Sequence, residues 1–209
     1  MTTSPKPRRS STPAPNAPFV FARRALNEPL ITGAVAPSGR QLSRALATNC
    51  TLIPSPNAPT VELGAGTGAV SSALLRRSRD TVLVESNRQF TVRLRSRFPQ
   101  IEVVCGDALD TMSRYESSSN VVSGLPFMAM PAEYVRDLLS AVVSSLRPGG
   151  SFTWFGYYGK RVIDFALTPE KRRNRNEVAS MLAELSDTPT HRIMLNVPPA
   201  RVWRWTKEL

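Results

Sequence analysis

Residues 60–68 read TVELGAGTG, a segment of four residues with apolar Val61 and Leu63 that runs directly into the alternating glycines Gly64, Gly66 and Gly68. The segment predicts a buried strand, and the residues that follow, with Val70 and Leu74 on one side, predict a helix. Glycines at such a turn let the backbone bend sharply and approach a ligand where any Cβ would clash. A strand, a glycine loop and a helix in this order are the context in which such a loop indicates nucleotide binding.

Strand and helix patterns alternate from this loop towards the C-terminus. Strands are predicted at residues 60–63, 81–84, 101–104, 121–122 and 152–157. Helices are predicted at residues 38–48, 87–97, 132–146 and 177–185, and a separate basic segment is predicted at 171–175. Residues 191–196 and 201–206 flank a Pro-Pro pair and predict an antiparallel hairpin. This alternation is typical of a mostly parallel sheet that helices cover on both faces.

Acidic side chains stand beside three of these strands. Glu62 precedes the glycine loop, Glu85 ends the second strand, and Asp107, followed by Ala108, comes after the third. Open α/β sheets bind ligands at the carboxyl ends of their strands, where these side chains would meet. Glu62 could meet a cationic amino group, Glu85 the hydroxyls of a ribose, and Asp107 the amino group of an adenine. The alternative is that Glu85 and Asp107 only cap the helices that follow.

These positions resemble the class I S-adenosylmethionine-dependent methyltransferases. The family signature is a loop of the form E-x-G-x-G-x-G, found here from Glu62 to Gly68, with an acid after the second strand and an Asp after the third. The resemblance implies an α/β, Rossmann-like fold with a seven-stranded, mostly parallel sheet and an antiparallel last strand. It also implies S-adenosylmethionine as the cofactor, because enzymes that bind NAD usually space their glycines as G-x-G-x-x-G.

The residues after the fourth strand bear on the methyl acceptor. Methyltransferases that act on the amino groups of bases carry Asn or Asp at the position where this chain has Gly124. The local oxygens left to hold an amine are the hydroxyl of Ser123 and the carbonyls of Gly124 and Leu125. Tyr157, at the end of the fifth strand, is a second candidate catalytic residue or else a core aromatic. Phe127 could hold a methylated cation against the face of its ring.

Residues 27–40, 122–126 and 196–200 together resemble the bacterial phospholipid N-methyltransferases, over residues 19–205. This resemblance implies methylation of phosphatidylethanolamine towards phosphatidylcholine. The chain departs from the family at Lys160, where a proline is expected, and at Phe127, where leucine is common. Both positions bear on the acceptor pocket.

Positive charge is concentrated near the N-terminus. The chain carries a net charge of +11, and residues 1–61 hold seven basic residues and one acid, which is 7 − 1 = +6. We predict a disordered basic tail over residues 1–18, an amphipathic helical extension over 19–50 and a catalytic domain over 51–209. Residues 19–26 are apolar on one side and cationic on the other, so they could lie on an anionic membrane or pack over the cofactor site. The basic segment 171–175 is either a solvated loop or a clamp for phosphate.

Several classes of protein are disfavoured. Two cysteines, Cys50 and Cys105, and one histidine, His191, are too few for a metal site built from such ligands. No stretch approaches the roughly 20 apolar residues that span a bilayer, and no apolar signal core follows the basic N-terminus, although an organellar transit peptide would share its composition. We therefore expect a cytoplasmic enzyme without metal, attached peripherally to the inner face of the membrane.

Two rival functions remain open. An adenine dimethyltransferase acting on ribosomal RNA would use the positive charge on phosphates, but Gly124 lacks the amide that such an enzyme needs, so nucleic acid is a disfavoured partner. A basic membrane-binding module without turnover would keep the fold alone. The glycine loop and the acids Glu85 and Asp107 argue against this second rival.

Overall fold

The computed structural model describes residues 39–50, 58–78, 80–157, 167–186, 189–194 and 198–209. Its strands are β1 (Thr60–Leu63), β2 (Thr81–Glu85), β3 (Glu102–Cys105), β4 (Ser118–Ser123), β5 (Leu146–Tyr157), β6 (His191–Ile193) and β7 (Ala200–Thr206). Its helices are α3 (Gly39–Thr48), α4 (Ala69–Leu74), α5 (Arg88–Arg97), α6 (Ala108–Met112), the short 3₁₀ turn η1 (Phe127–Ala129), α7 (Ala132–Ser145) and α9 (Pro169–Leu185).

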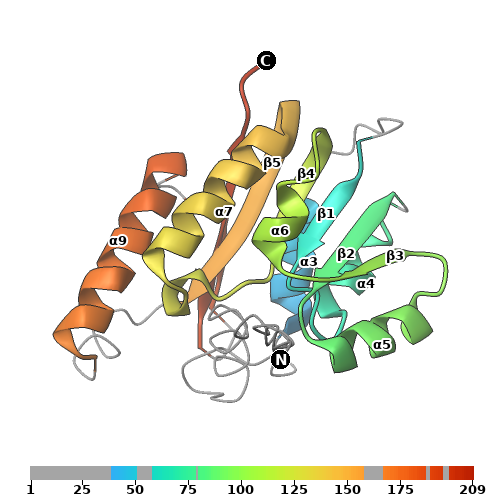
Figure 1. The fold of residues 1–209 in the computed structure, drawn as a ribbon, viewed down its shortest axis with the longest axis horizontal. Helices are drawn as coiled ribbons and strands as arrows, with labels where there is room; N and C mark the ends of the chain where they lie inside the picture. Colours follow the sequence, from blue (N-terminus) through green and yellow to red (C-terminus); the bar gives the residue numbers. More distant parts are fainter. Residues whose placement is uncertain (1–38, 51–57, 79, 158–166, 187–188, 195–197) are drawn as a thin grey trace, which may run out of the picture.

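The strands form one sheet in the order β3-β2-β1-β4-β5-β7-β6. Strands β1 to β5 are parallel, and β7 lies antiparallel between β5 and β6. This arrangement confirms the predicted Rossmann-like sheet with its antiparallel strand near the end of the chain. The order reverses between β1 and β4, which creates the crevice where α/β sheets bind ligands. The carboxyl ends of β1 to β5 all lie at the lower edge in Figure 1.

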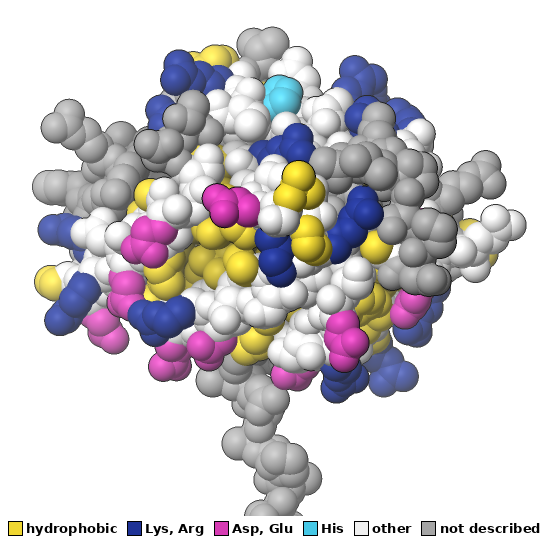
Figure 2. Space-filling view, turned by 90° about the horizontal axis from the view of Figure 1, so that it is seen from above, with side chains coloured by type: hydrophobic (Ala, Val, Ile, Leu, Met, Phe, Trp, Pro, Cys, Tyr) yellow, Lys and Arg dark blue, Asp and Glu magenta, His cyan; other side chains and the backbone are white. Residues whose placement is uncertain are grey.

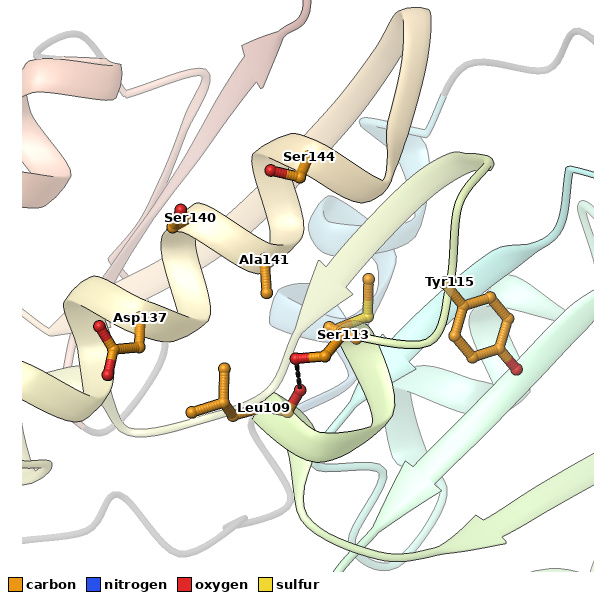
Figure 3. A pocket seen from close by; sticks show the side chains of 8 residues that line it. Leu109, Ser113, Tyr115, Asp137, Ser140, Ala141 and Ser144 are labelled. Carbon is orange, nitrogen blue, oxygen red and sulfur yellow. Dashed lines mark hydrogen bonds between the residues drawn. The ribbon is translucent and has the colours of Figure 1, made fainter.

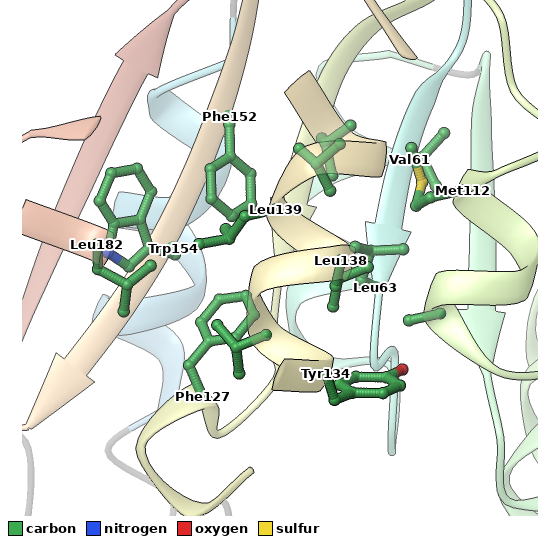
Figure 4. Close-up of a cluster of buried hydrophobic side chains, with 14 of the residues drawn as sticks. Val61, Leu63, Met112, Phe127, Tyr134, Leu138, Leu139, Phe152, Trp154 and Leu182 are labelled. Atoms are coloured by element: carbon green, nitrogen blue, oxygen red, sulfur yellow. The ribbon is translucent and has the colours of Figure 1, made fainter. Parts of the chain in front are cut away.

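Helices cover both faces of the sheet. Helices α6, α7 and α9 lie on the near face in Figure 1, while α3 and α4 lie behind the sheet. The near face holds the main core, where α7 packs on β1, β4 and β5, and Figure 4 shows its large side chains. Helix α3, the described part of the predicted extension, packs its Leu42 and Leu46 against β7 and α4. This described part of the extension therefore packs directly on the sheet.

Aromatic rings fill the core beneath α7. Phe152 stacks on Trp154 at 4.9 Å between ring centroids, and Trp203 of β7 extends the stack at 6.3 Å from Trp154. Phe127 joins it edge-on to Phe152 at 6.3 Å and is only 2% exposed. The prediction that Phe127 faces a methylated cation is therefore wrong. The turn η1 directs its ring into the core, where aromatic burial stabilises the fold.

Helix α9 and strand β5 both begin earlier than the sequence predicts. Helix α9 begins at Pro169, with Thr168 as its N-cap, so residues 171–175 form its first turns and not a separate loop. Strand β5 begins at Leu146, several residues before the predicted strand, because Leu146 pairs with Ser118 of β4 and a bulge over residues 147–150 precedes the next pair, Ser151 with Asn120. Turn η1 was not predicted, and α6 was anticipated only by the alternative that Asp107 caps a following helix. Ser38, residues 19–26 and residues 158–160, which carried other predictions, lie outside the described residues.

Candidate functional site

The three glycines of the loop have different tasks, although all adopt positive φ. A Cβ on Gly64 would lie 2.7 Å from the Leu125 side chain, and one on Gly68 would lie 2.9 Å from the ring of Phe98. These two glycines therefore allow the loop to pack on the segment that follows β4 and on the end of α5. A Cβ on Gly66 would meet nothing nearer than the Gly64 carbonyl at 3.9 Å. Gly66 thus leaves an open space at the tip of the loop, which suits the close approach of a ligand.

Glu85 holds the tip of the loop in place. Its carboxylate is 5% exposed, and its two oxygens accept hydrogen bonds from the amides of Gly66 (2.8 Å) and Asn87 (2.7 Å). The amide of Asn87 precedes α5, whose N-cap is the Asn87 side chain itself. A carboxylate offers about four acceptor positions, so Glu85 retains capacity for two hydroxyl donors beside Gly66. The position fits the predicted ribose contact.

Glu62 is a buried carboxyl group beneath α4. It is 1% exposed, and neither oxygen accepts a well-formed hydrogen bond from the residues that the structure describes. Burial raises the pKa of Glu62 to about 8, and the nearby Ser71 only partly offsets this rise. A buried carboxyl group without a partner is costly in its charged form, so it favours either a bound proton or a cation.

Asp107 joins two helices on the near face of the sheet. Its Oδ1 accepts from the amides of Leu109 (2.8 Å) and Asp110 (3.3 Å), which makes it the N-cap of α6. Both of its oxygens also accept from the hydroxyl of Tyr134 on α7, at 2.9 Å. Asp107 therefore performs the capping role, and a contact with adenine would be additional to it. Ala108, the first residue of α6, is buried.

The acceptor loop, residues 124–131, follows β4 beside the glycine loop. Ser123 is fully buried, and its hydroxyl oxygen accepts from the amide of Leu125 at 3.1 Å. Gly124 donates to the Leu63 carbonyl at 2.8 Å, and a Cβ at Gly124 would lie 2.8 Å from the Gly64 carbonyl. Contact between the two loops therefore requires a residue without a side chain at position 124.

Tyr157 stands at the carboxyl end of β5 on the opposite face of the sheet from Trp154. Its half-buried ring packs edge-on to Phe155 at 5.3 Å and borders the cluster that includes α3. Burial raises the pKa of its hydroxyl, which favours the protonated form as a hydrogen-bond donor. The structure places Tyr157 at the same edge of the sheet as Gly66 and Glu85.

A shallow cavity of about 360 Å³ lies elsewhere, between α6 and α7 (Figure 3). Its walls carry side chains from α6, from the segment that follows α6 and from one face of α7. They are Leu109, Met112, Ser113, Tyr115, Asp137, Ser140, Ala141 and Ser144. Neither Gly66 nor Glu85 lines it, so it is separate from the candidate site. Among the described residues no group of His, Cys, Asp and Glu is arranged to hold a metal ion.

The residues at the sheet edge fit S-adenosylmethionine. The open side of Gly66 suits a ligand that crosses the loop, and Glu85 next to it offers acceptors to a ribose. Glu62 supplies the buried acid that a cationic amino group would compensate. Each feature comes from a different strand or loop, and they lie around the end of β1, beside the point where the strand order reverses.

Cofactor binding is expected to release a proton from Glu62. In the free protein this carboxyl group is mostly protonated at pH 7, since its pKa is about 8. The contribution of Glu62 to the free energy of unfolding is therefore greatest at low pH, and it is lost as the pH rises through about 8. A nearby ammonium group would ionise it, with release of up to about one proton per cofactor.

Calorimetry in two buffers of different protonation enthalpy measures this release. Glu62→Gln, which mimics the protonated acid, should abolish it. An equal proton release in Glu62→Gln and in the wild type would show that another group titrates.

Comparison with known proteins supports the same class of protein. Residues 61–150 match the family described as "Methyltransferase domain". The chain is 34% identical over 146 residues to an ornithine lipid N-methyltransferase of Singulisphaera acidiphila, covering 64% of this chain and 74% of that protein. It is 42% identical over 77 residues to an rRNA methyltransferase of Streptomyces thermotolerans, covering 35% of this chain and 25% of that protein.

The fold matches solved methyltransferase structures. The N-methyltransferase NodS of Bradyrhizobium japonicum superposes with a TM-score of 0.63 at 15% identity, over 83% of this chain and 98% of that one. At this identity the likeness concerns the fold alone.

Two contacts of the site were not predicted from the sequence. Arg97 of α5 donates to the Thr67 carbonyl and to the Ser72 hydroxyl, both at 2.9 Å. It thereby connects α5 to the glycine loop and to α4. Asn174 of α9 bonds to both sides of Pro131, at the end of the acceptor loop. Neither residue stands in a recognisable motif. For Asn174 the available signal was a polar residue in line with the buried positions of its helix.

Proposed function

Because this chain belongs to the class I S-adenosylmethionine-dependent methyltransferases, we propose that it transfers the methyl group to the amine headgroup of a membrane lipid. The observation that carries the proposal is the lipid N-methyltransferase relative, which the chain matches over 74% of that protein's length. We favour phosphatidylethanolamine and its methylated derivatives, as the family resemblance implies. An ornithine lipid presents the same chemistry, an amine beside an apolar tail.

The acceptor loop supports a lipid amine over a nucleic-acid base. Base amino groups are held by an Asn or Asp side chain, and the contact between Gly124 and the Gly64 carbonyl leaves no room for one. The match to the rRNA methyltransferase covers only 25% of that protein. Transfer to ribosomal RNA is therefore the second candidate.

Methyl transfer requires the protein mainly to position the methyl donor and the acceptor amine. When bound, S-adenosylmethionine supplies a methyl group on a positively charged sulfur that is already activated for transfer. The protein must hold a neutral amine in line with that bond at near-attack distance. We assign this to the carbonyls of Gly124 and Leu125, with Tyr157 as a donor at the opposite wall. Ser123, which accepts from the Leu125 amide, would set the direction of those carbonyls.

Purified acceptors in mixed micelles test the substrate. The arms are phosphatidylethanolamine, an ornithine lipid, phosphatidylglycerol as a lipid without an amine, and ribosomal RNA, each with labelled S-adenosylmethionine. We expect label in at least one amine lipid and none in phosphatidylglycerol or RNA. Label in RNA with none in either amine lipid would favour the second candidate.

Membrane attachment completes the proposal and concerns the basic N-terminal residues. None of the helices within the described residues is long and apolar enough to cross a bilayer. Figure 2 shows the end of the molecule where β1 to β5 begin, and on it basic and acidic side chains are interspersed around an apolar area. That mixed surface contrasts with the +6 of residues 1–61. We therefore assign membrane contact, at the cytoplasmic face, to the N-terminal segment.

Deletion of residues 1–26 should abolish sedimentation with anionic liposomes. Each buried apolar side chain contributes about 1.5–3 kcal/mol, and each arginine adds about 1 kcal/mol near an anionic surface. Raised salt should weaken the wild type, and Arg23→Glu with Arg24→Glu should act like the deletion. Retained cofactor binding in the truncated protein serves as the folding control. Equal sedimentation of truncated and full-length protein in low and high salt would place the attachment elsewhere.

A further inference from the structure

Helix α7 begins without a cap of its own. Its N-cap position is Pro131, whose side chain makes no capping hydrogen bond, and a helix leaves its first four amides without partners inside the helix. The amide of Ala132 instead donates to the side-chain Oδ1 of Asn174 at 2.8 Å. Asn174 belongs to α9 and lies 42 positions later in the chain. The cap of α7 is therefore a tertiary contact.

The side-chain amide group of Asn174 also binds the residue before Pro131. The Nδ2 of Asn174 donates to the Met130 carbonyl at 2.8 Å. One side chain thus bonds to Met130, near the end of the acceptor loop, and to Ala132, the first residue of α7. The opposite end of the loop is fixed by the bond from Gly124 to the Leu63 carbonyl. Asn174 therefore closes the second end of the segment that begins at the cofactor loop.

Packing alone does not explain an asparagine at this position. Asn174, Val178 and Leu182 are spaced by four residues and so share one face of α9. Val178 and Leu182 are buried in the main core, whereas Asn174 is half-buried. Asparagine favours caps and turns over helix interiors, and an apolar residue would continue the buried stripe. The polar side chain is explained by its two bonds to the acceptor loop.

We propose that Asn174 is a positioning residue for the methyl acceptor. It holds the end of residues 124–131 against α9, and thereby fixes the backbone carbonyls of Gly124 and Leu125 relative to the glycine loop. The proposal rests on the proposed function, which places the acceptor amine at those carbonyls. Helix α9 also contacts η1 within the same loop, so the loop is held by α9 over its second half.

The chain offers a matched control between the same two helices. Arg136 of α7 forms an ion pair with Glu177 of α9, one turn further along each helix and on the exposed side. Glu177→Ala removes a contact between α7 and α9 and leaves the acceptor loop untouched. Asn174→Ala removes both bonds to the loop. Asn174→Asp keeps an acceptor for the Ala132 amide, with a negative charge that favours the N-terminus of α7, but it cannot donate to Met130.

Steady-state kinetics of the full-length chain test the proposal, with phosphatidylethanolamine and an ornithine lipid as acceptors. Asn174→Ala should lower kcat/KM for the acceptor about 10- to 100-fold, while the Kd for S-adenosylhomocysteine stays within about twofold of the wild type. Glu177→Ala should match the wild type in both measurements. Asn174→Asp should recover the thermal stability that Asn174→Ala loses and still show the weakened use of acceptor.

The outcomes separate this proposal from the proposed function. Asn174→Ala with the same acceptor kinetics as Glu177→Ala would overturn the positioning role while lipid transfer by the wild type stands. Full recovery of acceptor kinetics in Asn174→Asp would show that Asn174 only caps α7, which also overturns it. A wild type that labels neither lipid amine would refute the proposed function, and the positioning role with it.

Discussion

Glu85→Ala is expected to lower the affinity for S-adenosylhomocysteine at least about 100-fold. The carboxylate accepts from the amides of Gly66 and Asn87, so its removal releases the tip of the glycine loop. It also removes the acceptors that we assign to the ribose. Hydrogen bonds to charged groups are worth about 1.5–3 kcal/mol each, and two of them exceed the roughly 2.7 kcal/mol of a 100-fold change.

Isothermal titration with S-adenosylhomocysteine measures this loss. Glu102→Ala is the matched control, since it removes an exposed acid from the neighbouring strand β3. Glu85→Gln keeps one oxygen as an acceptor and should fall between the alanine variant and the wild type. An affinity of Glu85→Ala equal to that of the wild type would mean that the cofactor does not contact the end of β2.

Gly124→Ala is expected to reduce methyl transfer about 100-fold and to weaken cofactor binding as well. Its new Cβ would lie 2.8 Å from the Gly64 carbonyl, and backbone atoms cannot move aside as the end of a side chain can. The acceptor loop and the glycine loop would have to separate, and displacements of about 1 Å near reacting atoms cost about 100-fold in rate. Gly124→Asn, which restores the amide of the base methyltransferases, should likewise lose activity and gain none on RNA.

Gly106→Ala provides the control for Gly124→Ala. Gly106 lies at the same edge of the sheet, but a Cβ there would meet its nearest neighbour, the Thr111 hydroxyl, at an ordinary 3.5 Å. Transfer rates with saturating cofactor and the Kd for S-adenosylhomocysteine should therefore stay close to the wild type in Gly106→Ala. Wild-type rates in Gly124→Ala would show that the two loops do not need their close contact.

The sheet and the cofactor loop could be predicted because their signals are local. The strand that ends at Leu63 contains β-branched and apolar residues, and the glycines that follow it stand where the chain must turn. The acids after the next two strands could be placed at the ligand-binding edge because the carboxyl ends of parallel strands lie at one edge of the sheet. The structure places Glu62, Gly66 and Glu85 accordingly.

The acceptor side was less predictable because its determinants are tertiary. Phe127 follows a loop motif, yet the turn η1 buries its ring among residues of β5 and α7. Asn174 caps a helix that begins 42 residues earlier, and no local pattern connects the two. The basic residues 171–175 were separated from their helix because the buried stripe of α9 begins only at Val178, whereas the Thr168 cap starts the helix earlier.

The central claim is that the methyl group goes to a lipid amine. The most direct test offers total lipid and total RNA from one bacterium together to the full-length protein with labelled S-adenosylmethionine, and then identifies the labelled product by mass spectrometry. We predict label on the headgroup nitrogen of an amine lipid, with none above background in RNA and none in either fraction with Glu85→Ala. Label confined to RNA, or to a lipid position other than the amine, would contradict the account.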